Sequence, residues 1–242
     1  MRFSAKTSRS AVNQTARARP RRPRIDAHTV GRVLAILRRE SAGWNAPILT
    51  LVAAERDDPF LTLIGCILSL RTRDETTAAA AERLFSRATT PEAILKLAPD
   101  TLTQLIYPVG FYRTKTKVIR EICRALIARF GGRVPDEIDD LITLKGVGRK
   151  TANLVVTEAY HKPGICVDTH VHRISNRWGL VRTRNPDQTE TALREVLPRR
   201  YWIQYNRILV AFGQTLCQPL SPRCSTCPVA HLCPRIGVRR SR

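Results

Sequence analysis

The apolar segment FLTLIGCILSL, residues 60–70, constrains the fold of this chain more than any other stretch. Asp58-Pro59 precedes it, which is the pattern of a helix N-cap followed by proline in the first turn. A helix that is apolar on all sides must be surrounded by protein. We therefore expect a central core helix here, with other elements packed around it.

Helix start and stop signals recur along the remainder of the chain from Asp26 onward. Each expected helix opens on a residue whose side chain can accept hydrogen bonds from the first free amide groups. We predict such caps at Asp26, Asp58, Thr72 with Glu75 as a capping box, Thr90, Asp100, Asp136 and Asn185. Gly131-Gly132 is expected to end a long helix, and further helices are expected over 149–160 and 201–217. Strand patterning is nearly absent, so we predict an all-α fold of about ten helices.

The chain is strongly basic, with a formal net charge of +21. Residues 1–24 contribute eight Lys/Arg and no acid, which leaves +13 (21 minus 8) for the rest of the chain. A charge excess spread over the folded part attracts a polyanion, and nucleic acid is the commonest one in a cell. The alternative explanation is a source proteome rich in arginine.

The N-terminal segment, residues 1–25, is polar and rich in Arg, Ser and Pro, so we expect a disordered basic arm. This composition also resembles an organelle transit peptide, so targeting to an organelle stays open. No apolar run approaches the roughly 18 residues that a membrane helix needs, and no secretory signal is present. We expect a monomer without membrane contact, in the cytoplasm or nucleoid of a bacterial-type cell.

The segment LITLKGVGRKTANLVV, residues 141–156, is predicted to form a helix, a tight turn and a second helix. Gly146 and Gly148 permit positive φ angles and close approach of a ligand to the backbone. The free amide groups at the start of the second helix can bind a phosphate, and Arg149 and Lys150 add positive charge there. A plain helical hairpin is the alternative reading of this pattern.

Asp168, in the segment CVDTHVHRISNRWGL, falls where another helix should begin. Its simplest role is an N-cap that accepts bonds from the next amide groups. The alternative is a charged carboxylate that faces a cleft opposite Lys150. Removal of a base from DNA needs such a pair, because an amine can attack C1′ while a carboxylate stabilises the charge that develops on the sugar. Lys150 could equally be a phosphate contact.

Four cysteines, Cys217, Cys224, Cys227 and Cys233, lie within seventeen positions near the end of the chain. The total of seven cysteines is odd and no secretory signal is present, which argues against a disulfide framework. The spacing is not that of an ordinary zinc ribbon. Four thiolates could hold either zinc or a [4Fe–4S] cluster, and the spacing alone does not decide between them.

The combination of LKGVGRKTAN, VDTHVHRISNR and CQPLSPRCSTCPVAHLC, in this order, resembles the helix-hairpin-helix DNA glycosylases of the endonuclease III family. The similarity extends from about Asp26 to Cys233 and includes ILSLRTRDETT at 67–77. It implies a bifunctional glycosylase and abasic-site (AP) lyase of base excision repair. The implied partner is double-stranded DNA that contains abasic sites or oxidised pyrimidines such as thymine glycol. The resemblance also implies that the four cysteines hold a structural [4Fe–4S] cluster.

The resemblance implies a role for each matching residue. Lys150 would be the nucleophile, Asp168 would assist it, and Gly146-Val147-Gly148 would grip the DNA backbone. Further DNA contacts are expected from Arg71, Arg149, His170 and Arg223.

This sequence departs from the family pattern at two positions. Lys145 replaces the usual hairpin proline, and Arg71 stands where the family often has a glutamine that fills the gap left by a flipped base. An arginine can also fill this gap, because its planar guanidinium stacks and donates hydrogen bonds. A surface ion pair is the other reading of Arg71.

By the same resemblance we expect two lobes, with DNA bound between them. A helical barrel would span residues 52–162, and an iron–sulfur cluster domain would combine 26–51 with 163–242. The adenine-mismatch and thymine-mismatch glycosylases of this superfamily are alternatives, but both lack a lysine at the position of Lys150. A non-catalytic DNA-binding protein with a four-cysteine zinc site is a third alternative.

Overall fold

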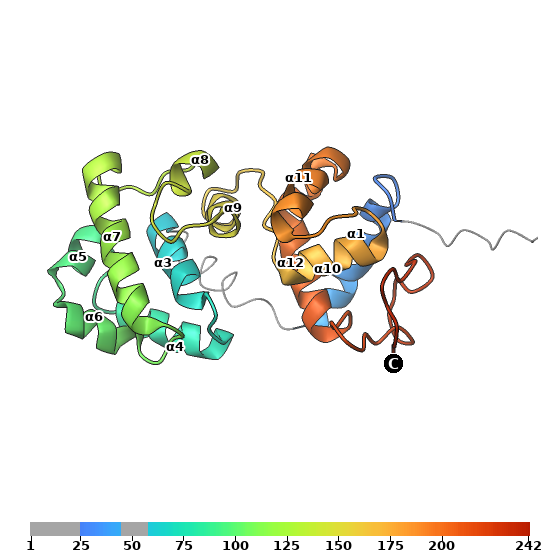
Figure 1. Cartoon of the computed structure of the whole chain (residues 1–242), viewed down its shortest axis with the longest axis horizontal. Helices are drawn as coiled ribbons and strands as arrows, with labels where there is room; N and C mark the ends of the chain where they lie inside the picture. Colours follow the sequence, from blue (N-terminus) through green and yellow to red (C-terminus); the bar gives the residue numbers. More distant parts are fainter. Residues whose placement is uncertain (1–24, 45–57) are drawn as a thin grey trace, which may run out of the picture.

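The computed structural model describes residues 25–44 and 58–242, and Figure 1 shows them as two groups of helices lying side by side. The helices are α1 Val30–Glu40, η1 Ser41–Gly43, α3 Pro59–Ser69, α4 Asp74–Phe85, α5 Pro91–Lys96, α6 Pro99–Ile106, α7 Tyr112–Phe130, α8 Ile138–Leu141, α9 Arg149–Glu158, α10 Thr169–Trp178, α11 Pro186–Val196, η2 Arg199–Tyr201 and α12 Trp202–Thr215. No strand occurs within these two ranges, so the prediction of an all-α fold is confirmed. None of the described helices is long and apolar enough to cross a membrane.

The first group of helices, α3 to α9, has its own hydrophobic core, which runs from Phe60 to Cys166. Its central helix is α3, in which every residue from Phe60 to Leu68 is buried and which packs against α4, α7 and α9. The Asp58 carboxylate caps this helix, because Oδ1 accepts hydrogen bonds from the amides of Phe60 at 2.7 Å and Leu61 at 3.1 Å. The predicted core helix and its cap are both confirmed.

The second group combines α1 with α10, α11 and α12 around a separate core. Ile25 belongs to this core: it is 1% exposed, and its N–H donates to the carbonyl of Trp178 at 3.2 Å. The basic arm expected over residues 1–25 therefore ends before Ile25. The remainder of the arm and the expected boundary at residues 51–52 lie outside the described residues, so the proposed domain limits stay a prediction.

Two further helix caps follow the sequence prediction. The Thr90 hydroxyl accepts from the amide of Ala93 at 3.2 Å, and the Asn185 side chain accepts from the amide of Gln188 at 2.9 Å. Both residues are followed by proline in the first turn of their helices. Where the cap and the helix are adjacent in sequence, the local pattern determines the start of the helix.

Four predicted caps are wrong. Asp26 accepts from the amide of Thr29 at 2.8 Å, but the N-cap of α1 is Thr29 itself. In two other cases the side chain has a partner from a distant part of the chain. The Thr72 hydroxyl accepts from the amide of Gly110 at 3.0 Å, and α4 begins two residues later without a side-chain cap. Asp136 pairs with the ammonium of Lys162 at 2.9 Å, and α8 likewise starts two residues later. Asp100 lies inside the first turn of α6, not before it.

Candidate active site

The turn between α8 and α9 has the tight geometry expected for a helix-hairpin-helix. Gly146 adopts φ +83°, and a Cβ at this position would lie only 2.7 Å from Cγ1 of Val118 on α7. Val147 is buried, and its N–H already donates to the carbonyl of Leu144 at 3.0 Å. The Val147 side chain and amide are therefore occupied within the protein, and the DNA contact expected of this turn stays a prediction.

Gly148 opens helix α9 with a φ of −92°, so the positive φ expected at this glycine does not occur. No heavy atom lies within 4 Å of the place where its Cβ would be, and α9 has no side-chain cap. The first amide groups of α9 are thus free to bind an anion from outside the helix. Lys150 is exposed in this same first turn.

Asp168 is the N-cap of α10, as its sequence context predicts. Its Oδ1 accepts from the amides of His170 at 2.9 Å and Val171 at 2.8 Å. The residue is half-buried. The two amide donors fix the orientation of the carboxylate at the start of α10.

Lys150 and Asp168 both influence the pKa values of His170 and Cys166. His170 is half-buried, and burial lowers the pKa of its imidazole; Asp168 opposes this shift, and Arg173 and Lys150 add to it. Burial likewise raises the pKa of the Cys166 thiol, with Lys150 and Asp168 acting on it in opposite directions. The Cys166 thiol also donates to the carbonyl of Lys150 at 3.7 Å, which places the backbone of Lys150 beside the segment that leads to Asp168.

A buried amide side chain ties Asp168's segment to the helix of Lys150. Asn153 on α9 accepts from the amide of Ile165 at 3.0 Å through Oδ1, and it donates to the carbonyl of Arg149 at 3.0 Å. The carbonyl of Cys166 accepts from the Asn206 side chain on α12 at 3.0 Å. The three residues before Asp168 are thus held by both groups of helices.

Arg149, expected to contact DNA, forms an ion pair with a carboxylate of the protein although its side chain is 44% exposed. Its guanidinium makes two hydrogen bonds to the buried carboxylate of Glu190 on α11, at 2.9 and 3.0 Å. Arg194 binds the same carboxylate at 2.9 Å and also reaches Asn153. The charge of Arg149 is compensated by Glu190, so the structure places this arginine in a link between α9 and α11.

His170 packs against α12 in a space that only glycine allows. Its Nδ1 lies 3.1 Å from Nη2 of Arg173, and a Cβ on Gly213 would lie 2.4 Å from the same nitrogen. Any larger residue at position 213 would therefore displace the His170 ring.

Arg71 lies at the opposite end of α3 from Asp58, in a turn exposed to solvent. Its backbone has φ +53°, which is unusual for a residue with a side chain. The guanidinium lies 5.6 Å from the centre of the Phe111 ring, and Phe111 also has a positive φ of 58° and is 63% exposed. The two side chains form a protruding pair that the sequence pattern does not reveal.

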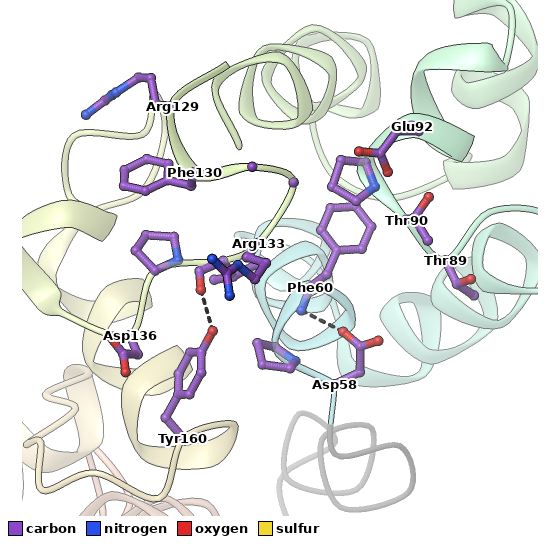
Figure 2. Close-up of a pocket in the computed structure, with 16 residues that line it drawn as sticks. Asp58, Phe60, Thr89, Thr90, Glu92, Arg129, Phe130, Arg133, Asp136 and Tyr160 are labelled. Atoms are coloured by element: carbon purple, nitrogen blue, oxygen red, sulfur yellow. Dashed lines mark hydrogen bonds between the residues drawn. The ribbon is translucent and has the colours of Figure 1, made fainter. Parts of the chain in front are cut away.

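A cavity of about 1000 Å³ lies at the start of α3, away from Lys150 and Asp168. Figure 2 shows it between Asp58, Thr90 and Glu92 on one side and Phe130, Asp136 and Tyr160 on the other. The Tyr160 hydroxyl donates to the carbonyl of Val134. Neither Lys150 nor Asp168 lines this cavity.

The four C-terminal cysteines line one small space behind α12, together with Trp178, Phe212 and Val229. All seven cysteines of the chain are described and are free of disulfides. Burial raises the pKa of the Cys227 thiol to about 11 and raises those of Cys217 and Cys233. Arg177 donates to the Cys217 sulfur at 3.4 Å, an arrangement that favours a thiolate.

The donor set of this space fits a soft metal centre, since four unpaired sulfurs face it from one segment. Among the described residues, no three His, Cys, Asp or Glu side chains converge closely enough to hold a metal ion. Arg223 lies between the ligands in sequence and is exposed, as a DNA contact at this position requires.

Sequence reasoning missed three residues that organise the site: Asn153, Glu190 and Lys115. Asn153 and Glu190 are buried polar residues within otherwise amphipathic helices. The sequence contained one signal for these residues: a polar side chain at an inward-facing helix position. Such a buried group needs a hydrogen-bond partner, so the position indicates a structural contact. Each has one partner four residues away on its own helix, but the partners that join separate segments lie 12 and 41 residues away, so the pattern could not identify those.

Comparison with known proteins defines first the class and then the family. Residues 64–199 match the model of the HhH-GPD superfamily of base excision DNA repair proteins. The chain is 48% identical over 176 residues to endonuclease III of Thermotoga maritima, covering 73% of this chain and 83% of the relative.

Two solved structures are also similar. One is a non-covalent endonuclease III–DNA complex, with a TM-score of 0.76 and 33% identity, covering 86% of this chain and 95% of the other. The second is a trapped covalent endonuclease III–DNA intermediate, with a TM-score of 0.75 and 32% identity, covering 86% and 96%. The chain belongs to the endonuclease III family. It is a DNA glycosylase and AP lyase that acts on DNA in base excision repair.

Proposed function

We propose that this glycosylase removes oxidised pyrimidines and nicks the resulting abasic site by β-elimination, with Lys150 as its nucleophile. The observation that carries the proposal is the position of Lys150, which is exposed in the uncapped first turn of α9 and whose carbonyl accepts from Cys166, two residues before Asp168, at 3.7 Å. A similar solved structure is named as a covalent intermediate with DNA, which supports an amine nucleophile in this family.

In the proposed reaction the Lys150 nitrogen attacks C1′ of the everted nucleotide while the bond from C1′ to the base breaks. The base leaves with the bonding electron pair and takes up a proton. The attacking nitrogen then loses a proton, and the C1′–O4′ bond breaks while O4′ takes up a proton, which gives a protonated Schiff base between Lys150 and C1′. Loss of a proton from C2′ then expels the 3′ phosphate and cuts the strand.

Asp168 would stabilise the positive charge that develops on the sugar and assist proton transfer. Its two amide donors fix the direction of the carboxylate. The same bonds start α10, so the residue would serve the fold and the reaction together.

The DNA backbone would lie against the free amide groups of Gly148, Arg149 and Lys150. Arg71 would enter the gap left by the everted base, and His170 and Arg223 would add phosphate contacts. Arg149 would contribute through its backbone amide, since its side chain is held by Glu190.

We further propose that Cys217, Cys224, Cys227 and Cys233 hold a [4Fe–4S] cluster. The cluster would supply a structural crosslink that couples metal binding to the folding of the last segment. Arg177 would donate to a ligand sulfur, as it does to Cys217. We place the enzyme in the cytoplasm, at the nucleoid.

Borohydride trapping on a duplex with an abasic site tests the mechanism. Wild-type protein should give a covalent protein–DNA adduct, and Lys150→Ala should give none; a normal yield from this variant would exclude Lys150 as the nucleophile. Asp168→Asn separates the two roles of Asp168, because asparagine is an equally good helix cap without the charge. We expect it to keep the wild-type melting temperature and to slow trapping at least about tenfold.

A panel of duplexes with thymine glycol, adenine opposite 8-oxoguanine, and a G·T mismatch tests the substrate. Excision of thymine glycol supports the proposal. Excision restricted to either mismatch would assign the chain to the alternative specificities.

A further inference from the structure

A buried ammonium group lies beneath the turn that carries Arg71. Lys115 on α7 is 6% exposed, and its Nζ donates to the carbonyls of Leu68 at 2.7 Å and Leu70 at 2.6 Å. The third bond goes to the hydroxyl of Thr72 at 3.0 Å. An ammonium has three donors, so every donor of Lys115 is directed at the segment 68–72.

These three acceptors surround Arg71. Leu68 is in the last turn of α3, Leu70 follows that helix, and Thr72 comes directly after Arg71. Carbonyls at a helix C-terminus lack partners inside the helix and carry partial negative charge, so a cation is favourable there. The bonds fix the chain on both sides of Arg71, whose left-handed conformation needs support from its surroundings.

The segment at Gly110 and Phe111 also contacts the Arg71 turn. The Thr72 hydroxyl accepts from the amide of Gly110 at 3.0 Å, and it lies 3.2 Å from the carbonyl of Leu70. A Cβ on Gly110 would lie 2.4 Å from the carbonyl oxygen of Arg71, so the two backbones touch. The Phe111 ring, next to Gly110, lies under the Arg71 guanidinium.

We propose that Lys115 is the positioning residue of the Arg71 turn: it holds Arg71 and its supporting segment at the place where the guanidinium enters the gap in DNA. The proposal rests on the gap-filling role proposed for Arg71. Lys115 is covered by protein and acts only through the turn. Preformed geometry lowers the cost of binding, because the loop need not be ordered when DNA arrives.

A buried lysine that served stability alone would behave differently. Loss of such a residue weakens the fold and lowers all activities in parallel. Loss of a positioning residue lowers activity most where the gap must be filled, which is in duplex DNA. A single-stranded abasic oligonucleotide has no opposite base and no gap.

The test compares single-turnover rates of abasic-site nicking on duplex and on single-stranded DNA, and the readout is the ratio of the two. Lys115→Met removes the ammonium and keeps the length of the side chain. We expect the duplex to single-strand ratio to fall about tenfold, and Arg71→Ala to lower it similarly. The double variant should show little additional loss, because the two residues act as one unit.

The chain offers a matched control on the same helix. Arg120 on α7 donates to the carbonyl of Leu97, which follows α5, at 2.7 Å. Arg120→Met thus removes a comparable bond from a side chain to a helix end, but this bond does not involve the segment 68–72. We expect it to lower the melting temperature without changing the ratio.

Thr72→Val gives a second variant in case Lys115→Met does not fold. It removes the hydroxyl that joins Lys115 to Gly110, and Thr72→Ser keeps that hydroxyl as its control. We expect a smaller fall in the ratio for valine and a nearly wild-type ratio for serine.

A fluorescence measurement reports the turn without catalysis. With 2-aminopurine opposite a tetrahydrofuran abasic analogue, saturating Lys115→Met should give the same emission as saturating Arg71→Ala, different from wild type. The positioning role would be overturned if Lys115→Met left both the rate ratio and the emission unchanged. It would also be overturned if Lys115→Met and Arg120→Met changed the rate ratio equally. No effect of Arg71→Ala on the ratio would instead refute the proposed function of Arg71.

Discussion

Removal of the charge on Glu190 is expected to weaken the link between α9 and α11. Glu190→Gln keeps the shape of the side chain but removes the carboxylate that Arg149 and Arg194 share. A hydrogen bond to a charged group contributes about 1.5–3 kcal/mol. The two arginine side chains are 44% and 31% exposed, so water screens part of this contribution. We therefore expect a loss of about 2 kcal/mol in the free energy of unfolding.

Thermal unfolding followed by circular dichroism measures this loss. For a chain of this length a change of 2 kcal/mol lowers the melting temperature by about 4–8 °C. Glu195→Gln is the matched control, since it removes the same charge from an exposed position of the same helix. We expect its effect to stay within about 0.5 kcal/mol. Equal melting temperatures for the two variants would refute the reasoning.

The same carboxylate makes stability depend on pH. Burial raises the pKa of Glu190, but the hydrogen bonds and charges of Arg149 and Arg194 outweigh it, so the pKa is lowered overall. A lowered folded-state pKa means that the stabilisation is fully present above the unfolded pKa of about 4.3. It is lost as the pH falls through the folded pKa. Urea unfolding from pH 6 to pH 3 should show this loss for wild type and a smaller one for Glu190→Gln.

Three further changes test separate parts of the structure. Gly146→Ala should lower the free energy of unfolding in urea by about 1–3 kcal/mol, because Gly146 has a positive φ and an added Cβ would contact Val118. Gly148→Ala should lower it less, because Gly148 has a negative φ and its Cβ would point into open space. Asp58→Ala should cost about 1 kcal/mol by the same method through loss of the α3 cap, and a smaller change than about 0.3 kcal/mol would contradict this role. Cys224→Ser should reduce the iron content and the visible absorption of the purified protein; unchanged iron would exclude Cys224 as a ligand.

Much of the fold could be predicted from local pattern. Asp58, Thr90, Asn185 and Asp168 each precede the helix that they cap, so the bond forms within three residues and the sequence contains all of its parts. Thr72 and Asp136 have the same local pattern but bind Gly110 and Lys162 instead. No residue close to Thr72 or Asp136 in sequence indicates that a distant partner competes with the helix amides for the side chain.

The candidate site was less predictable than the fold. Lys150 and Asp168 come from recognisable motifs, but the compensation of Arg149 depends on Glu190, which is 41 residues away. Lys115 is one of several basic residues on an amphipathic helix, and its burial depends on where α3 ends 46 residues earlier. Charge and spacing identify residues that are able to bind or react, whereas tertiary packing decides which of them remain accessible to a ligand.

The two separate cores have a consequence for the order in which the chain is made. All buried residues of the first core lie between Phe60 and Cys166, so this core can close as soon as that stretch has left the ribosome. α1 leaves earlier, but its partners on α12 are synthesised about 170 residues later, which takes roughly ten to thirty seconds. During this interval the apolar face of Val30, Val33, Leu34 and Leu37 has no lasting cover. The nascent chain is therefore most vulnerable to aggregation at its first helix, and a ribosome-associated chaperone would be most useful there.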